Sequence, residues 1–303
     1  PPTDGGFDGG MIEVEDGKAV RIPSSPASEA ALPAYTAWHP SAPLAAFSRN
    51  NQGLFMRGAG VEPREVYDLK SDLAVFDAKT GEISPVPDTG EQRTVSTFPA
   101  WSADGEYLYY SSAAVGASQP PYDSYASIKY DLMRIRYDAR SGAWGKPEIV
   151  LSAAKTGQSI TQPRPSPDGR YLVFCMSPHG CFPVLSPGAN LYLMDLAEDR
   201  QFAYRPLEKA NSTEADSWHC WSSNSRWIVF SSKRGTGLFA RPYLCYVDRE
   251  GNVQKPFVLP QRDPRFYDTC LQTFNVPELV RGPVKVAKDD LARAILSDAA
   301  PGP

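Results

Sequence analysis

Apolar and polar residues alternate along the chain in short runs of the length expected for β-strands, and helical periodicity is almost absent. Tight turn sequences such as Asp104-Gly105 and Asp168-Gly169 separate pairs of runs, and these sequences tolerate the positive φ of a hairpin turn. The pattern therefore predicts an all-β chain of antiparallel hairpins.

Four segments of the chain align with one another without gaps. Each has an aromatic residue or proline, then a turn, then an apolar strand, and they begin at Trp38, Trp101, Pro165 and Trp221. The spacing is about 56 to 64 residues, and a second hairpin pattern follows each segment. Repeated four-stranded antiparallel units that bury their faces against each other form a β-propeller. We expect Trp38, Trp101 and Trp221 to fill the gaps between blades.

The number of blades depends on how the ring closes. Residues 11–21 match only the outer hairpin of a repeat, which is half a blade. The remaining strands would come from residues 276–286 or from residues upstream. We favour five blades, with six as the alternative.

The chain divides into a propeller, residues 1–260, and a C-terminal extension, residues 261–303. Two short helices are expected in the extension. Asp263 followed by Pro264 is an N-cap and N1 pair that opens a helix over residues 265–273, and residues 288–296 carry Leu291 and Ile295 on one stripe.

The charge and hydropathy of the sequence argue against nucleic acid and membranes as partners. The net charge of −4 and the pI near 5.5 come without clustered Lys and Arg, which argues against binding to nucleic acid or to an anionic membrane surface. No segment approaches the roughly 20 apolar residues of a membrane span. The opening residues 1–6 lack a signal-peptide pattern and resemble a trimmed N-terminus, so we expect upstream residues.

The five cysteines are an odd number and have no Cys-x-x-Cys spacing. This pattern excludes a zinc ribbon, a thioredoxin motif and c-type haem attachment within the chain. In one interpretation, Cys175 and Cys181 form a disulfide that closes a small loop. The favoured interpretation is that the cysteines are buried free thiols.

The long connections of such a propeller gather on one face, which we expect to be the binding surface. Tyr and Arg dominate interface hot spots. The candidate partner-binding residues are Arg57, Arg64, Tyr67, Tyr122, Tyr125, Arg234 and Arg241. The alternative is a set of solvated loops over structural tyrosines.

Asp216, Trp218 and His219 are candidates for the central channel. His219 either lines the channel or donates to a carbonyl of the neighbouring blade, and the second is favoured. His179 and Cys181 are a weak metal-binding pair, because such sites need three or four ligands.

The repeated position of Asp72, Asp131 and Asn190 fits either a ring around calcium or, preferably, a series of turn caps.

No catalytic motif is present. The chain lacks a Gly-x-Ser-x-Gly elbow, a P-loop and a dinucleotide-binding glycine pattern, and it has three scattered histidines. We therefore expect no catalytic residues and favour a noncatalytic propeller. The alternative is a propeller lyase or hydrolase, or a small-ligand or metal-binding protein, that uses the central channel.

The pattern Trp-Ser-x-Asp-Gly-x-Tyr-Leu at residues 101–108, with a following Asp-Leu and a Thr-Gly turn, resembles the repeat of TolB-type propellers, and the resemblance spans residues 11–260. Residues 65–73, 216–227 and 274–279 resemble a bacterial subfamily whose relatives often carry an upstream Cys-x-x-Cys-His segment, which this chain lacks.

The resemblance implies a periplasmic or extracellular location and a protein-docking or scaffold role. It also implies a protein partner, for which a multihaem cytochrome or an envelope complex is the candidate. Haem would then come only from the partner or from an upstream segment, and no cofactor is expected within the chain itself.

Overall fold

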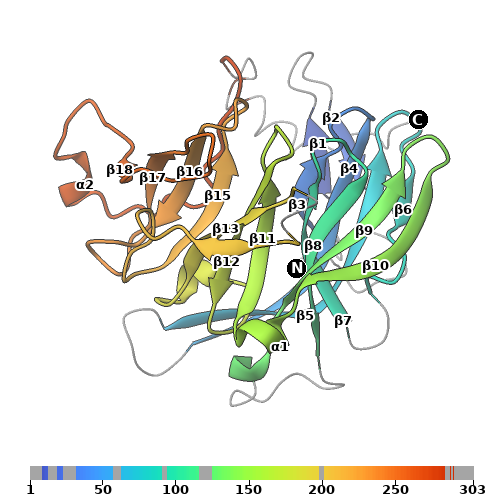
Figure 1. Ribbon diagram of the computed structural model, residues 1–303, viewed down its shortest axis with the longest axis horizontal. Helices are drawn as coiled ribbons and strands as arrows, with labels where there is room; N and C mark the ends of the chain where they lie inside the picture. Colours follow the sequence, from blue (N-terminus) through green and yellow to red (C-terminus); the bar gives the residue numbers. More distant parts are fainter. Residues whose placement is uncertain are drawn as a thin grey trace, which may run out of the picture.

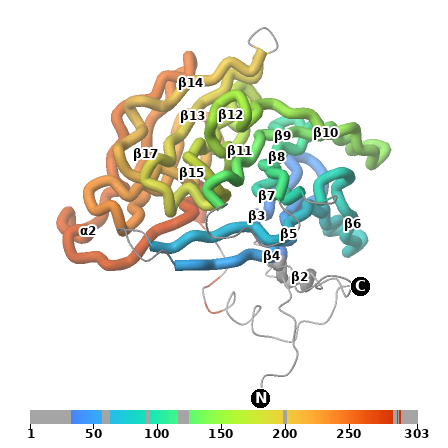
Figure 2. Tube along the Cα trace, turned by 90° about the horizontal axis from the view of Figure 1, so that it is seen from below, coloured from blue at the N-terminus to red at the C-terminus, as the bar shows by residue number. Residues whose placement is uncertain are grey.

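The computed structural model describes residues 9–12, 19–22, 32–56, 63–90, 94–115, 125–197, 201–283, 287 and 289. These residues form four four-stranded antiparallel sheets and a separate hairpin, with only two short α-helices, α1 (Ala153–Thr156) and α2 (Phe266–Thr269). The sheets stand around a common axis as the blades of a β-propeller (Figures 1 and 2).

Each blade is an antiparallel meander, numbered here from the N-terminus. Blade 1 contains β3 (Leu32–Trp38), β4 (Leu44–Met56), β5 (Arg64–Asp77) and β6 (Ile83–Pro85), and blade 2 contains β7 (Thr94–Trp101), β8 (Tyr107–Ala114), β9 (Asp131–Asp138) and β10 (Ala143–Leu151).

Blades 3 and 4 repeat the same order. They contain β11 (Ser159–Pro165), β12 (Tyr171–Ser177), β13 (Asn190–Asp195), β14 (Tyr204–Pro206), β15 (Asp216–Trp221), β16 (Trp227–Ser232), β17 (Arg241–Tyr246) and β18 (Phe257–Val258). The 3₁₀ turns η1 (Tyr125–Ser127) and η2 (Pro183–Leu185) lie in the long connections of blades 2 and 3.

The favoured count of five blades is wrong for the described residues, which contain four complete blades. The half-blade expected at residues 11–21 is a two-stranded hairpin of β1 (Gly9–Ile12) and β2 (Ala19–Ile22). Residues 276–283, one proposed source of closing strands, form no strand.

A serine and an acidic or amide residue set the tight turn in blades 2 to 4. The Ser102 hydroxyl donates to Asp104 at 2.5 Å and accepts the backbone N–H of Tyr107 at 2.9 Å. Ser166 with Asp168, and Ser222 with Asn224, make the same pair of bonds. The next residue, Gly105, Gly169 or Ser225, has positive φ, so the repeated motif specifies the turn directly.

His39 joins the tight turns of blades 1 and 2. Its Nδ1 accepts the Ala42 N–H at 3.0 Å, and its Nε2 lies 3.2 Å from the Gly105 carbonyl oxygen. A Cβ at residue 105 would lie 2.3 Å from Nε2, so Gly105 is required by this contact as well as by its φ of +77°.

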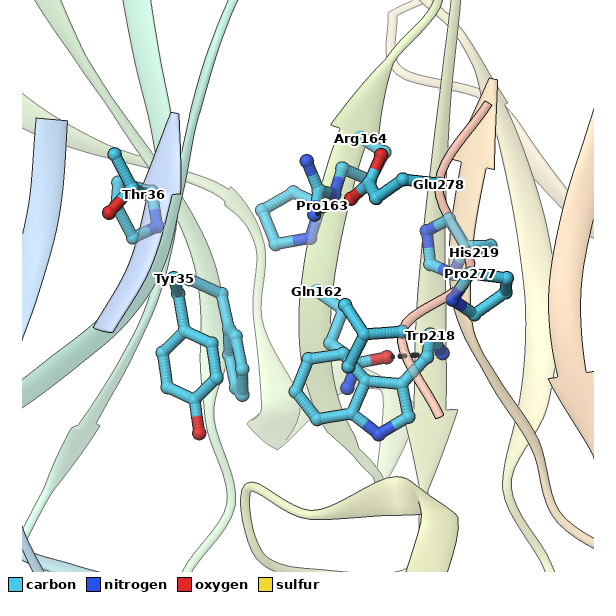
Figure 3. Close-up of a pocket in the computed structure, with 12 residues that line it drawn as sticks. Tyr35, Thr36, Gln162, Pro163, Arg164, Trp218, His219, Pro277 and Glu278 are labelled. Atoms are coloured by element: carbon cyan, nitrogen blue, oxygen red, sulfur yellow. Dashed lines mark hydrogen bonds and ion pairs between the residues drawn. The ribbon is translucent and has the colours of Figure 1, made fainter. Parts of the chain in front are cut away.

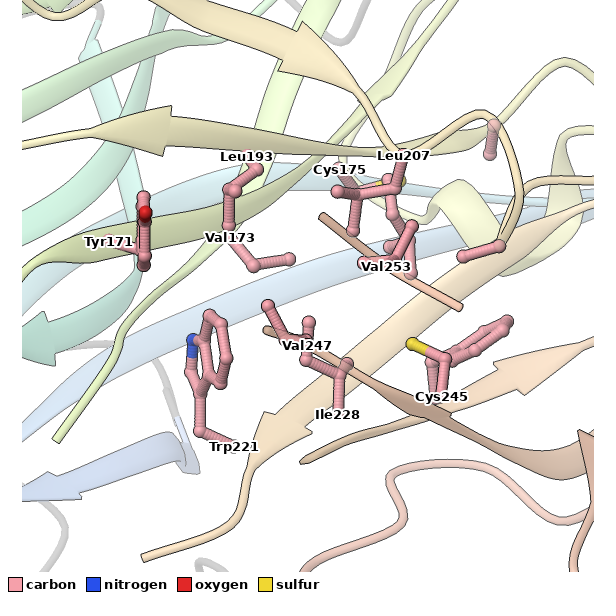
Figure 4. Close-up of a cluster of buried hydrophobic side chains, with 14 of the residues drawn as sticks. Tyr171, Val173, Cys175, Leu193, Leu207, Trp221, Ile228, Cys245, Val247 and Val253 are labelled. Carbon is pink, nitrogen blue, oxygen red and sulfur yellow. The ribbon is translucent and has the colours of Figure 1, made fainter. Parts of the chain in front are cut away.

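Apolar layers between consecutive blades form the core. Figure 4 shows the layer between blades 3 and 4, in which Tyr171 and Val173 face Trp221 and Ile228. Separate layers lie between blades 1 and 2 and between blades 2 and 3. Each sheet has two faces, and packing against the neighbouring blades removes the apolar side chains on those faces from water.

Trp101 and Trp221 fill gaps between blades as predicted, but Trp38 does not. Trp101 and Trp221 each pack against the preceding blade and are buried. Trp38 holds the same position in blade 1 and is 53% exposed. The reason is that the described residues contain no blade before blade 1.

The C-terminal extension is held to blade 4 by Arg241. Its buried guanidinium donates to the backbone carbonyls of Tyr267, Cys270 and Gln272. These carbonyls therefore bond to a side chain instead of continuing a helix, so α2 ends at Thr269 and is shorter than the expected helix over 265–273. The helix expected over 288–296 lies outside the described residues.

The layer between blades 3 and 4 predicts a large difference between two isoleucines. Ile228→Ala leaves a cavity at a fully buried position, so it should destabilise the fold by about 2–5 kcal/mol. Ile149 on β10 is 59% exposed, and Ile149→Ala should change the free energy of unfolding by no more than about 0.5 kcal/mol. Urea unfolding followed by tryptophan fluorescence measures both, and equal values would contradict the interblade core.

Candidate binding site

A bulge in the innermost strand of every blade aims one residue at the propeller axis. The residues are Tyr35, Phe98, Gln162 and Trp218, and each has φ between 48° and 57° at the point where the pairing register shifts. Left-handed φ in a bulged strand turns the side chain away from the sheet. The four blades thus contribute three aromatic rings and one amide to the channel.

The three rings are in contact and form an aromatic floor. The centroid of Tyr35 lies 4.3 Å from that of Phe98 and 5.7 Å from that of Trp218. The Gln162 side-chain oxygen accepts the Trp218 backbone N–H at 2.9 Å, the contact drawn dashed in Figure 3. The channel is therefore filled at this level instead of being an open pore.

A cavity of about 200 Å³ lies against this floor. Its sides carry Pro99, Pro163 and Pro277, the last from the C-terminal extension. Arg164 and Glu278 form an ion pair beside the cavity, with Nη2 and Oε1 3.1 Å apart and both side chains partly exposed (Figure 3).

His219 lines this cavity and also contacts the neighbouring blade. Its Nε2 lies 3.0 Å from the Val173 carbonyl oxygen of β12. Burial lowers the pKa of His219 to about 3. The imidazole is therefore neutral at pH 7 and cannot supply a proton as a general acid.

The cysteines are free thiols, and four of them are held in the protonated form. Burial raises the pKa of Cys220, beside the channel, to about 12, and does the same for Cys245. The pKa values of buried Cys175 and Cys181 lie well above the usual range for the same reason. These thiols do not act as nucleophiles at neutral pH, since the thiolate is the reactive form.

The long-loop face is crossed by a two-stranded ribbon made of the ends of β4 and β5. Residues 52–56 pair with 64–68 beyond the last contact of β3, at Asn50. Figures 1 and 2 show this ribbon running out from blade 1 across the other blades. It contacts loops of blades 2 and 3, where the Tyr125 hydroxyl donates to the Val66 carbonyl at 2.8 Å and the Cys181 Sγ lies 3.7 Å from the same oxygen.

A buried carboxylate anchors the ribbon where it leaves blade 1. Asp68 accepts hydrogen bonds from Asn50 at 2.9 Å, from Gln52 at 3.0 Å and from the Tyr130 hydroxyl at 2.8 Å. Burial and the nearby Asp68 carboxylate hold the pKa of Tyr130 well above its usual range, so this hydroxyl remains a donor. The ribbon is thus fixed to blade 2 by hydrogen bonds to one buried carboxylate.

The structure places the candidate partner-binding residues in different environments. Arg64 is exposed near the ribbon tip, whereas Tyr67 lies half-buried with its ring 5.8 Å from that of Tyr125. Tyr125 itself is buried. Arg57 and Tyr122 lie outside the described residues.

Arg234 and Arg241 make internal contacts in blade 4. Arg234 donates to Asp216 at 2.9 Å and to the Ser232 hydroxyl at 2.7 Å, and its guanidinium stacks over Tyr243. Asp216 is fully buried in this ion pair and does not line the cavity, whereas Trp218 and His219 do.

The metal candidates are dispersed. Within the described part of the chain, no group of three or more His, Cys, Asp or Glu side chains is placed to hold a metal ion. His179 lies 3.8 Å from Glu65 and packs on Tyr125, while Cys181 points into an apolar cluster.

The repeated position of Asp72 and Asp131 serves local contacts. Asp72 pairs with Arg49 at 2.6 Å, and Asp131 accepts the backbone N–H of Ala153 at the start of α1 at 2.6 Å.

Tyr35, Phe98, Gln162, Arg164 and Glu278 were not identified as site residues from the sequence. A usable signal exists for the first three, because each precedes the first residue of an aligned segment by three positions, as does Trp218. Glu278 reaches the channel only through the path of the extension, which no repeat specifies.

No protein-family model matches the chain, and no curated protein matches it. Solved structures similar to it include TolB from Acinetobacter baumannii, at 12% identity and a TM-score of 0.42, covering 90% of this chain and 67% of that one. A prolyl endopeptidase structure is 15% identical, with a TM-score of 0.48 and coverage of 82% and 32%. An oligogalacturonate lyase in complex with manganese is 14% identical, with a TM-score of 0.45 and coverage of 84% and 73%.

The chain thus spans only about a third of the prolyl endopeptidase chain that it resembles. Among the described residues, no helix has the length and apolar character needed to cross a membrane.

The burial of His219 predicts a pH dependence of stability. In the unfolded chain, the His219 side chain binds a proton near pH 6.5, but in the folded protein it does so only near pH 3. The contribution of neutral His219 to the free energy of unfolding is therefore fully present above pH 6.5 and is lost as the pH falls below that value. Over this window the loss should approach about 1.4 kcal/mol per pH unit. Urea unfolding of the wild type and of His219→Gln between pH 7 and pH 4 tests this, since the variant should lack this part of the slope. Parallel slopes would contradict a neutral buried His219.

Proposed function

We propose that this protein is a noncatalytic, exported docking body that binds a protein partner through the outer side of the β4–β5 ribbon. The observation that carries the proposal is a pair of exposed apolar side chains on an ordered ribbon. Leu54 is 63% exposed and Met56 is 61% exposed, although Phe55 between them packs against Tyr67 and Tyr125.

The charge of the ribbon favours an acidic and apolar partner surface. In the described part of the ribbon and at its base, the exposed residues are Gln52, Leu54, Met56, Arg64 and Lys70. The ribbon's acidic residues, Glu65 and Asp68, are buried. The outer side therefore presents apolar and cationic groups, which complement a partner that carries carboxylates around an apolar centre.

The chemistry of the channel supports a noncatalytic role. With a pKa lowered to about 3, His219 is not a general acid at pH 7 and is a weak general base, and the protonated thiols are poor nucleophiles. The carboxylate of Glu278 is ion-paired with Arg164. No second carboxylate lines the described cavity, so an acid and base pair of the glycosidase type is not formed there.

The resemblance of the repeats to TolB-type propellers makes an exported multihaem cytochrome or an envelope complex the first partner class to examine. In this proposal any haem belongs to the partner.

The test compares partner capture by surface variants. The wild-type protein is used to purify partners from its native source, and mass spectrometry and an optical spectrum identify proteins and haem in the eluate. The affinity of each candidate is then measured with purified components. Leu54→Asp combined with Met56→Asp should weaken the specific partner about tenfold or more, because it places carboxylates in the apolar centre.

Ile149→Asp is the matched control, since Ile149 is equally exposed but lies on the outer part of blade 2. It should bind like the wild type, and all three proteins should unfold at the same urea concentration. A partner that binds the double variant and the wild type equally would exclude the ribbon as the docking surface.

A further inference from the structure

The cavity against the aromatic floor has the surface of a site for one small ring. Its floor is the face formed by Tyr35, Phe98 and Trp218, and the prolines on its sides expose C–H groups without backbone donors. Its volume of about 200 Å³ is smaller than that of most drug-sized pockets and suits a single ring. Aromatic and proline surfaces of this kind bury the flat, apolar side of a ring.

The Arg164–Glu278 pair determines which polar groups such a ring would carry. The pair is neutral as a whole, so it does not favour a charged ligand, and it places a donor and an acceptor 3.1 Å apart. Two hydroxyl oxygens on adjacent ring atoms lie about 3 Å apart, whether they are gauche on a saturated ring or coplanar on an aromatic one. One hydroxyl then accepts from the guanidinium and its neighbour donates to the carboxylate.

The ion pair can keep its own bond while it binds both hydroxyls. A guanidinium has five N–H donors and a carboxylate has about four acceptor positions, whereas the pair itself uses one of each. Binding therefore requires no separation of the two charges.

Three polar atoms without a hydrogen-bond partner belong to residues that line the cavity. Gln162 Nε2, Trp218 Nε1 and His219 Nδ1 are buried in side chains that line the cavity, and none has a hydrogen-bond partner in the protein. Buried polar atoms normally have partners. The Gln162 and Trp218 nitrogens are donors. The Nδ1 of His219 is an acceptor when the Nε2 of the same ring donates to the Val173 carbonyl.

We propose that this cavity binds a small uncharged ring that carries two adjacent hydroxyl groups. This chemistry is shared by catechols and by sugar rings. The site lies on the channel axis and does not depend on the docking role of the ribbon.

The test titrates the full chain with catechol and with methyl α-D-glucopyranoside. Phenol and cyclohexanol, which have one hydroxyl each, and benzoate, which is charged, are the comparison ligands. Binding is followed by saturation-transfer NMR and by quenching of tryptophan fluorescence. Catechol, the glucoside or both should bind saturably, and the single-hydroxyl analogue should bind about tenfold more weakly, as expected for loss of one charge-assisted hydrogen bond. Which of the two binds identifies the source of the diol.

Matched variants test the ion pair. Glu278→Gln and Arg164→Met should each weaken diol binding about tenfold, because each removes one charge-assisted bond to the ligand. The controls are Glu106→Gln and Arg136→Met in the exposed Arg136–Glu106 pair, where the closest atoms are 3.8 Å apart, and these should leave binding unchanged. Glu278 and Arg164 are partly exposed, and their variants should unfold at the same urea concentration as the controls.

Three results would overturn the proposal. The first is that neither diol binds. The second is that phenol or benzoate binds as tightly as catechol, and the third is that the Glu278 and Arg164 variants bind like the wild type.

Discussion

A four-stranded blade has two faces, and the structure depends on covering both of them with neighbouring blades. Where a neighbour is present, aromatic and branched side chains interdigitate and become inaccessible, as Trp221 and Ile228 do against blade 3. Where the described residues contain no preceding blade, the equivalent residue is exposed, as Trp38 is in blade 1. The same side chain is therefore core or surface according to the blade before it, because a single sheet cannot bury its own faces.

The bulges determine which side chains lie in the central channel. A regular innermost strand would alternate its side chains between the two neighbouring blades, and few would meet at the axis. One left-handed residue in each strand breaks the alternation and sends Tyr35, Phe98, Gln162 and Trp218 to the same place. The result is a floor of three aromatic rings and one amide with a small cavity against it.

On the long-loop face, the ribbon shows which kinds of residue are buried and which are exposed. Its acidic residues satisfy internal donors, as Asp68 does with Asn50, Gln52 and Tyr130, and its apolar residues divide between the inner and outer sides. Arg234 and Arg241, which loop composition predicts at an interface, also make internal contacts with blade 4 and with the C-terminal extension. Loop composition could not separate these roles, because Arg and Tyr serve equally well as surface contacts and as internal donors to carbonyl groups.

The sequence by itself determined the hairpins, the tight turns and the propeller class, because each depends on residues that are close in the chain, such as Ser102 with Asp104. The tertiary structure decided the number of blades, the burial of Tyr125 and Arg241, and the meeting of Arg164 with Glu278. These features depend on pairs that are distant in sequence, and the alternating pattern of a strand specifies two faces without specifying what covers them. The bulge residues fall between these cases, since their repeated position is visible in the sequence but their convergence requires the arrangement of the blades around one axis.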